Sequence, residues 1–181
     1  MVTVSSYTWQ PNDVVTKALL DTNIRDNLTV LLQRPFFWFY RTLTNEAFSS
    51  STWKRCQLDG VHADTENGRE SINGFWSYRI QTTGIWFILG AIPWDNNPNG
   101  LRYCQVAKDS ASAGTNSAAA FSGGFSDNGS YGYVTQSHFM TKFTAGSYLN
   151  LDGYQSSGSS LKYVRGFYGG PMLAGVCLRS G

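Results

Sequence analysis

Charged side chains are scarce in this 181-residue sequence, and the two signs nearly cancel. Lysine and arginine number 14 and aspartate and glutamate number 12, which leaves a formal net charge of +2. The basic residues are scattered along the chain, whereas a nucleic-acid-binding surface needs them gathered on one face or segment. We therefore expect no nucleic-acid partner.

Cysteine and histidine are also rare. The three cysteines, Cys56, Cys104 and Cys177, form no close pair, so the sequence indicates neither a disulfide framework nor a zinc site. We expect reduced, packed thiols. A nucleophilic cysteine would need a base beside it, and His62 and His138 are the only histidines. The sequence predicts no cofactor and no bound metal.

Long hydrophobic runs are missing too. The longest run, from Gly84 to Trp94, is about half the length of a membrane span and is broken by Pro93. The first nine residues have no basic start followed by an apolar stretch, so they lack the pattern of a secretory signal. We expect a soluble protein that does not insert into a membrane.

The carboxylates show no arrangement that indicates catalysis. Asp59, Asp64 and Glu66 lie in one loop and Asp95 in another, whereas a glycosidase needs two carboxylates about 5 to 10 Å apart across the bond to be cleaved. Each is flanked by Asn, Gly or Thr, a context in which carboxylates cap turns. The sequence favours turn capping over calcium binding and catalysis, and we expect no catalytic residue.

Glycine and aromatic residues are abundant, and Ser, Thr and Asn separate short apolar runs, which is the composition of an all-β protein. The clearest strand covers 147–154, where Leu149 and Leu151 alternate with polar and tyrosine residues that would share the other face. A strand with one apolar face needs a second sheet to cover it.

The same patterns predict eight to ten strands in all. With no helix expected after residue 32, this number favours a jelly-roll β-sandwich head over residues 35–181. A polar turn is expected over 59–68. The expected strands are 36–40, 53–58, 75–81, 85–94, 101–107, a short strand at 118–121, 131–143, 147–154, 160–164 and 172–178.

Residues 1–34 form a different segment, which we interpret as an N-terminal arm. Thr16 is a suitable N-cap for one short α-helix over about 16–32, and Pro35 ends it. Apolar residues on one stripe of so short a helix must lie against the rest of the chain, sister helices or a larger assembly. The candidate anchoring and oligomer seam is Trp9, Leu20, Ile24, Asn27, Leu28 and Leu31.

Aromatic residues beside polar loops offer flat faces on which a sugar ring could stack. Two such places are the segment after residue 94 and the segment around residue 131, although aromatic residues are more often part of a core. The candidate glycan-binding residues are Trp94, Asn97, Tyr131 and Tyr133.

Two parts of the chain resemble known families. Residues 8–28, with T-W-Q-P-N-D-V-V-T at the start and N-I-R-D-N-L at the end, resemble the N-terminal arm of many tailed-bacteriophage virion proteins. The rest resembles the jelly-roll head shared by complement globular-head and tumour-necrosis-factor-like proteins. The matching residues are Gly84-Ile85-Trp86, Trp94, Asn97, Gly100 and Arg102, Ala145-Gly146 with Tyr148, and Tyr154-Gln155 with Gly158.

The resemblance implies a homotrimeric virion appendage, either a tail fibre or a capsid decoration, which is assembled in the host cytoplasm and lies on the virion surface. Its implied partners are two copies of itself, other virion proteins through the arm, and a host-surface glycan. The heads of that family pack as trimers around aromatic inner strands, and strands 36–40 and 85–94 are apolar on both faces. The residues expected at the trimer interface are Phe37, Phe39, Trp86 and Ile88.

Two alternatives differ from this hypothesis in kind. One is a stand-alone lectin, for which the arm would be dispensable. The other is a surface-polysaccharide depolymerase, which would need clustered carboxylates in a groove.

Overall fold

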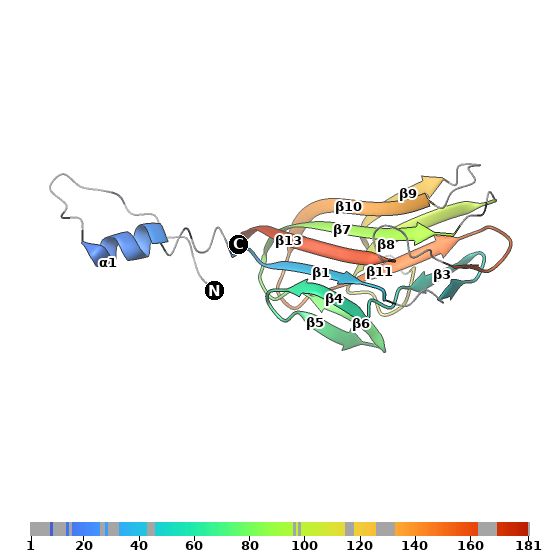
Figure 1. Ribbon diagram of the computed structural model, residues 1–181, viewed down its shortest axis with the longest axis horizontal. Helices are drawn as coiled ribbons and strands as arrows, with labels where there is room; N and C mark the ends of the chain where they lie inside the picture. The colour runs from blue at the N-terminus through green and yellow to red at the C-terminus, as the bar shows by residue number, and fades with distance from the viewer. Residues whose placement is uncertain are drawn as a thin grey trace.

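Two antiparallel sheets packed face to face make up most of the chain in the computed structural model (Figure 1). The structure describes residues 8, 14, 16–25, 28, 33–42, 46–95, 97, 99–114, 118–125, 133–162 and 170–180. Its elements are helix α1 (Lys17–Leu20), the π-helical turn η1 (Asp21–Arg25), and strands β1 (Phe36–Tyr40), β2 (Ala47–Phe48), β3 (Thr52–Arg55), β4 (Gly60–Asp64), β5 (Arg69–Ile72), β6 (Phe75–Arg79), β7 (Gly84–Trp94), β8 (Leu101–Lys108), β9 (Ala118–Phe125), β10 (Tyr133–Phe143), β11 (Tyr148–Gln155), β12 (Leu161–Lys162) and β13 (Met172–Ser180).

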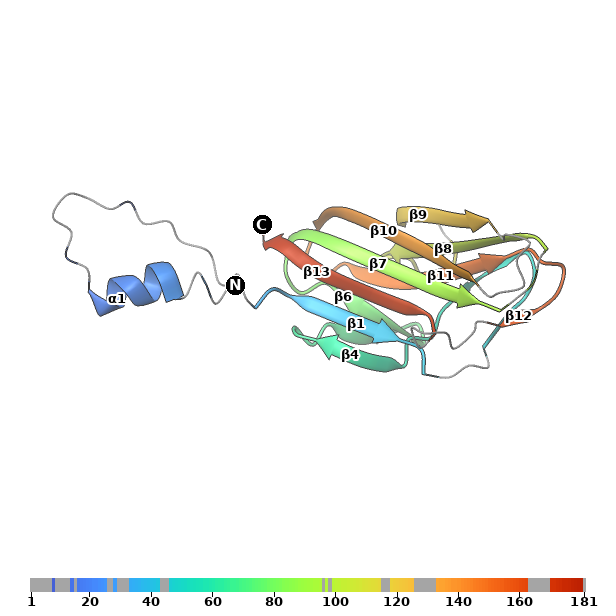
Figure 2. The same cartoon turned by 45° about the horizontal axis from the view of Figure 1, so that its top comes forward.

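The first sheet has five strands in the order β10-β7-β13-β1-β4, which Figure 2 shows side by side. The second has the order β5-β6-β11-β8-β9, and β3 also pairs with β11. Strands that neighbour each other in a sheet are often distant in the sequence: β13 lies between β1 and β7. The all-β sandwich expected from the sequence is confirmed.

The core lies between the two sheets. Residues at alternate positions of β1 and β7 are fully buried. Leu149 and Leu151 of β11 lie in the core as predicted, but Asn150 and Asp152 between them are buried as well, so the half-exposed strand expected from the sequence is not observed. At Gly90 a Cβ would lie 2.7 Å from Leu151 Cδ1 and 2.8 Å from Val106 Cγ2. Both of those side chains belong to the opposite sheet, so glycine is needed for the sheets to approach this closely.

Half of residues 59–68, expected as a polar turn, form strand instead, and the turn is confined to the residues after Asp64. β4 covers Gly60–Asp64 and pairs with β1 along the edge of the five-stranded sheet. The sequence pattern failed here because an edge strand in contact with water has no need of apolar residues at every second position.

The helix begins where the sequence predicted. The Thr16 side chain accepts a hydrogen bond from the Leu19 N–H at 3.2 Å, as an N-cap does. The described helical residues end at Arg25 apart from Leu28, and the predicted end near residue 32 lies outside the described residues. No helix among the described residues is long and apolar enough to cross a membrane.

Candidate functional site

The carboxylates at the end of β4 and in the loop that follows it hold local turns together. Both oxygens of Asp64 accept backbone N–H bonds, from Gly68 and Arg69, at 3.0 Å each. Glu66 accepts hydrogen bonds from the hydroxyls of Tyr78 and Thr82. Turn capping, the role that the sequence favoured, is confirmed for Asp64.

Asp59 is tied to the segment that follows β1. Its carboxylate accepts the N–H and the hydroxyl of Thr42, at 2.7 Å each, and lies 3.3 Å from the Arg41 guanidinium. Partial burial alone would raise the pKa of Asp59, but these contacts with Thr42 and Arg41 outweigh it and hold the pKa below its ordinary value.

Metal-binding and nucleophilic side chains do not gather in the part of the chain that the structure describes. No group of three or more His, Cys, Asp or Glu residues that could hold a metal ion occurs there. Cys56, Cys104 and Cys177 are buried and unpaired, and burial raises the pKa of each thiol. Protonated, inaccessible thiols are poor nucleophiles.

The residues expected at the trimer interface lie in the core instead. Phe37, Phe39, Trp86 and Ile88 are fully buried within a single chain and belong to the cluster between the sheets. A neighbouring chain cannot reach them, so this assignment is corrected. The outward positions of β1 and β7 are the residues between them, because successive side chains of a strand point to opposite faces.

Those outward positions form a broad apolar surface on the five-stranded sheet, which we name the outer apolar face. The register aligns Phe87 with Met140 on one side and with Val176 on the other, and Val176 with Phe36. Phe87 is 38% exposed and Met140 is 64% exposed. The face comprises Phe36, Trp38, Tyr40, Ile85, Phe87, Leu89, Val134, Met140, Met172, Ala174 and Val176.

Of the four candidate glycan-binding residues, the structure describes the side chains of Trp94 and Asn97, and both are bonded within the chain. Trp94 is fully buried, and its indole N–H donates to the Thr135 hydroxyl at 2.8 Å, so the stacking role given to it is corrected. Asn97 shapes its loop: its side-chain oxygen accepts the Asn99 N–H at 2.9 Å. The backbone of Tyr133 pairs with that of Trp94, and the Tyr133 side chain and the whole of Tyr131 lie outside the described residues.

The residues of the expected seam that the structure describes are exposed. Leu20, Ile24 and Leu28 all present much of their side chains to solvent, and α1 has no buried residue. Trp9, Asn27 and Leu31, the other members of the expected seam, lie outside the described residues. An isolated helix with such a stripe is marginally stable unless a partner covers it.

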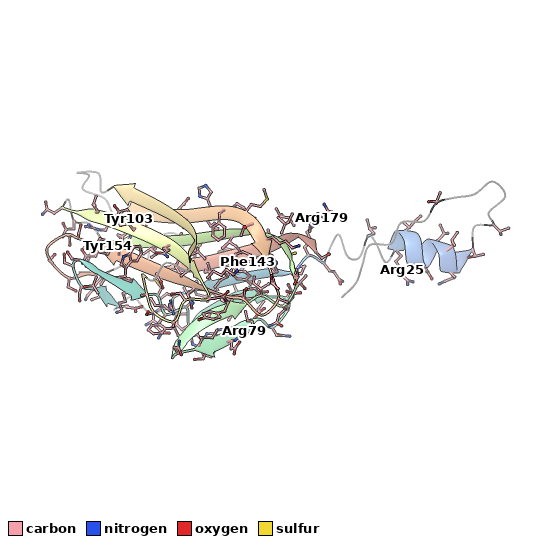
Figure 3. All side chains as sticks on the ribbon, turned by 180° about the vertical axis from the view of Figure 1, so that it is seen from behind. Arg25, Arg79, Tyr103, Phe143, Tyr154 and Arg179 are labelled. Carbon is pink, nitrogen blue, oxygen red and sulfur yellow. The ribbon has the colours of Figure 1, made fainter. Side chains whose placement is uncertain are left out.

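A second cluster of aromatic residues, not found from the sequence, lies on the outer surface of the six-stranded sheet. The ring centroids of Trp53 and Tyr154 are 5.4 Å apart, those of Tyr103 and Tyr154 are 5.7 Å apart, and those of Trp53 and Tyr103 are 6.3 Å apart. Each residue is half-buried. Figure 3 shows Tyr103 and Tyr154 together at the end of the sandwich away from Arg179. We name these three residues the outer aromatic cluster.

A row of polar residues crosses the same surface, two residues along each strand from the outer aromatic cluster. The register aligns Asp152 with Arg55 on one side and with Gln105 on the other, and we name these three residues the polar row. Arg55 Nε donates to Asp152 at 3.0 Å, and all three side chains are buried. Burial raises the pKa of Asp152, while the bonds from Arg55 and from the Gly114 N–H favour its ionised form.

Residues 109–114 lie over the polar row, and we name them the covering loop. Arg55 Nη1 donates to the Ser110 carbonyl at 2.9 Å, and the Gly114 N–H donates to Asp152 at 3.1 Å. Gly114 has φ +72° and packs so closely on Trp53 that a Cβ there would clash with the indole. This loop accounts for the burial of the polar side chains of Arg55 and Asp152 on an outward face.

Comparison of the coordinates with solved structures reveals the fold. The globular domain of zebrafish complement 1qA matches with a TM-score of 0.50 and 10% identity, over 81% of this chain and 99% of that one. The fold is a complement-head and tumour-necrosis-factor-like jelly roll. The Eiger tumour necrosis factor from S. frugiperda shares this jelly roll at a TM-score of 0.57 and 10% identity, over 82% and 94% of the two chains.

Murine APRIL at pH 8.0 has the same jelly roll, with a TM-score of 0.52 and 13% identity, over 80% of this chain and 99% of that one. No protein-family model and no curated protein matches the sequence. The likeness between the jelly rolls therefore concerns the fold, which sequences this different can share when the pattern of buried positions is kept.

Proposed function

We propose that this chain is a homotrimeric structural protein of the bacteriophage virion surface, a tail fibre or a capsid decoration, that binds a partner and catalyses no reaction. The jelly-roll head forms the trimer, and the arm over residues 1–34 attaches it to other virion proteins. The trimer is assembled in the host cytoplasm and carried on the particle.

The main observation in support of the proposed trimer is the outer apolar face. Eleven mostly apolar residues share one side of a sheet, and several of them are substantially exposed in a single chain. Contiguous exposed apolar surfaces of this kind mark protein–protein contacts. Copies of the same chain are the natural occupants, because closed symmetric assemblies are the commonest oligomers and the jelly roll is the fold for which the sequence resemblance implies trimers.

The arm supports attachment to a larger particle. Its helix exposes Leu20, Ile24 and Leu28, which need a cover from sister helices or from another virion protein. The resemblance of residues 8–28 to phage virion arms is what favours a virion as that particle.

Binding is favoured over catalysis by the carboxylates of the head. Asp59 and Asp64 are engaged by backbone and side-chain donors around their turns, and Asp152 is paired with Arg55. A polysaccharide depolymerase would need two carboxylates facing a shared substrate groove.

Light scattering coupled to size exclusion on the full-length chain tests the trimer. We expect three times the monomer mass of 20.0 kDa. A monomer at all concentrations would overturn the trimer. Mass spectrometry of purified phage particles from cells that make the protein tests the virion location, and its absence from the particles would overturn that part.

A lectin that binds a host-surface glycan is the second candidate. The outer aromatic cluster favours it, because three rings gathered at one end of the sandwich offer apolar surface to a ligand. A lectin would keep its solubility and sugar binding without residues 1–34, whereas the virion protein needs them for attachment.

A further inference from the structure

The polar row contains buried atoms that lack hydrogen-bond partners. Gln105 is 1% exposed, and neither its side-chain oxygen nor its side-chain nitrogen is bonded to any part of the chain that the structure describes. The same is true of Arg55 Nη2 and of the side-chain nitrogen of Asn150, whose side-chain oxygen accepts a bond from the Ser77 hydroxyl. Leaving such a group unpaired costs about 1–3 kcal/mol. These atoms therefore leave room for a polar partner that the described part of the chain does not supply.

All of these side chains belong to one surface. Cys104 and Val106 of β8 point inward, since both lie beside Gly90 of the opposite sheet. Tyr103 and Gln105, which alternate with them, therefore point outward. The unpaired amide of Gln105 is thus two residues along the same strand face from a ring of the outer aromatic cluster.

The charges of the row determine what kind of partner fits. Arg55 is paired with Asp152, so the row offers no net charge to attract a phosphate or another anion. A purely apolar ligand would leave the Gln105 amide unpaired. Gln105 offers donors and an acceptor together, which is the pattern that matches neighbouring hydroxyl groups.

We propose that this surface binds a carbohydrate: one face of a pyranose ring packs on the outer aromatic cluster, and its hydroxyl groups bond to Gln105 and Arg55. A pyranose combines a face of C–H groups with a rim of hydroxyls, and the site combines rings with an unpaired amide and guanidinium. The hydroxyls reach the polar row by displacing the covering loop, two of whose bonds to the row, through Ser110 and Gly114, are described above.

The proposed carbohydrate site lies where it can contact a ligand carried on a surface outside the protein. The site lies on the six-stranded sheet, opposite the outer apolar face, so the proposed trimer leaves it free. The Pro35 carbonyl, where the arm joins the head, accepts a hydrogen bond from the Cys177 N–H, so the arm joins the sandwich close to Arg179. Figure 3 shows Tyr103 and Tyr154 at the other end of the sandwich from Arg179. The binding end thus faces away from the arm.

Saturation-transfer NMR on the full-length protein tests the site. The probes are the methyl pyranosides of glucose, galactose, mannose and N-acetylglucosamine. We expect at least one to bind, and Tyr154→Ala to weaken its binding by about tenfold or more, as loss of a stacking ring does. Trp76→Ala is the matched control: this tryptophan is 36% exposed and stacks with Arg69 outside the cluster, so its removal should leave binding unchanged.

A second variant separates binding from folding. Gln105→Leu removes the unpaired amide but keeps the side-chain bulk, so the protein should unfold at the same or a higher temperature while sugar binding falls. Binding by none of the four probes, or equal binding by wild type, Tyr154→Ala and Gln105→Leu, would overturn the site. Light scattering on the same samples keeps the two proposals distinct, because a trimer that ignores sugars refutes only the site and a monomer that binds them refutes only the trimer.

Discussion

Replacing Phe87 with aspartate should break the trimer while leaving the head folded. Phe87 lies near the middle of the outer apolar face, on β7, between Met140 and Val176 in the register. Its side chain points away from the core, so the aspartate replaces no buried contact between the sheets.

The magnitude follows from the surface that remains to be covered. A phenylalanine offers about 200 Å² and Phe87 is 38% exposed, which leaves about 75 Å² for a neighbouring chain. At about 25 cal/mol per Å² this surface contributes about 2 kcal/mol per chain and about 6 kcal/mol per trimer. That loss weakens trimer formation by about four orders of magnitude, before the cost of burying a carboxylate is added.

Light scattering across a concentration series measures the effect, and far-UV circular dichroism checks that the head is folded. Leu101→Asp is the matched control, because Leu101 is 37% exposed but belongs to the six-stranded sheet. Met140→Asp, in the next strand, should act like Phe87→Asp. A folded Phe87→Asp variant that remains trimeric, or a Leu101→Asp variant that dissociates equally, would refute the outer apolar face as the interface.

Three further predictions concern stability. Gly175→Ala should lower the free energy of unfolding in urea by about 1–2 kcal/mol, because a Cβ there clashes with the Phe37 ring. Replacing glycine also reduces the entropy of the unfolded chain, but this offsets only part of the strain. An unchanged urea midpoint would contradict this packing. Arg55→Met should lower the free energy of unfolding by about 3–5 kcal/mol in the same assay, because it leaves the buried Asp152 carboxylate without its ion-pair partner. An unchanged free energy of unfolding would show that the pair is not buried. The pKa of Asp59 is lowered in the folded protein, so its contribution to stability is complete above its unfolded pKa of about 3.9 and is lost as the pH falls through the folded pKa. In Asp59→Asn the free energy of unfolding should therefore depend less on pH below about pH 4. Parallel curves of stability against pH for the two proteins would contradict this role of Asp59.

The sequence predicts elements well where one face of a strand is apolar and the other polar. In β11 the two leucines alternate with polar residues, and the structure buries the leucines in the core as expected. The sandwich itself follows from such strands, since each needs a second sheet to cover it.

The sequence does not determine which face points inward when both are apolar. In β7 every residue from Ile85 to Leu89 is apolar, so an inward Trp86 and an inward Phe87 fit the pattern equally well. The choice depends on Gly90, whose missing side chain lets the opposite sheet approach, and on the register with neighbouring strands. A shift of one residue exchanges the core with the surface, which is why the expected trimer residues were misplaced.

The outer aromatic cluster was missed for a different reason. Its three rings come from β3, β8 and β11, and they meet only because β11 pairs with both of the other strands. The burial of Arg55 and Asp152 depends in turn on the covering loop, whose path is a tertiary property. Neither can be derived from spacing along one strand.

The position of β13 has a consequence for synthesis of the protein. Of the described strands in the five-stranded sheet, β13 is made last and β1 first, yet β13 sits between β1 and β7. The edge of the aromatic strand β1 that pairs with β13 therefore has no partner strand until nearly the whole head has been translated. Such long-range pairing is slow and leaves strand edges unpaired, so a newly made head is prone to aggregate with other copies until β13 has paired.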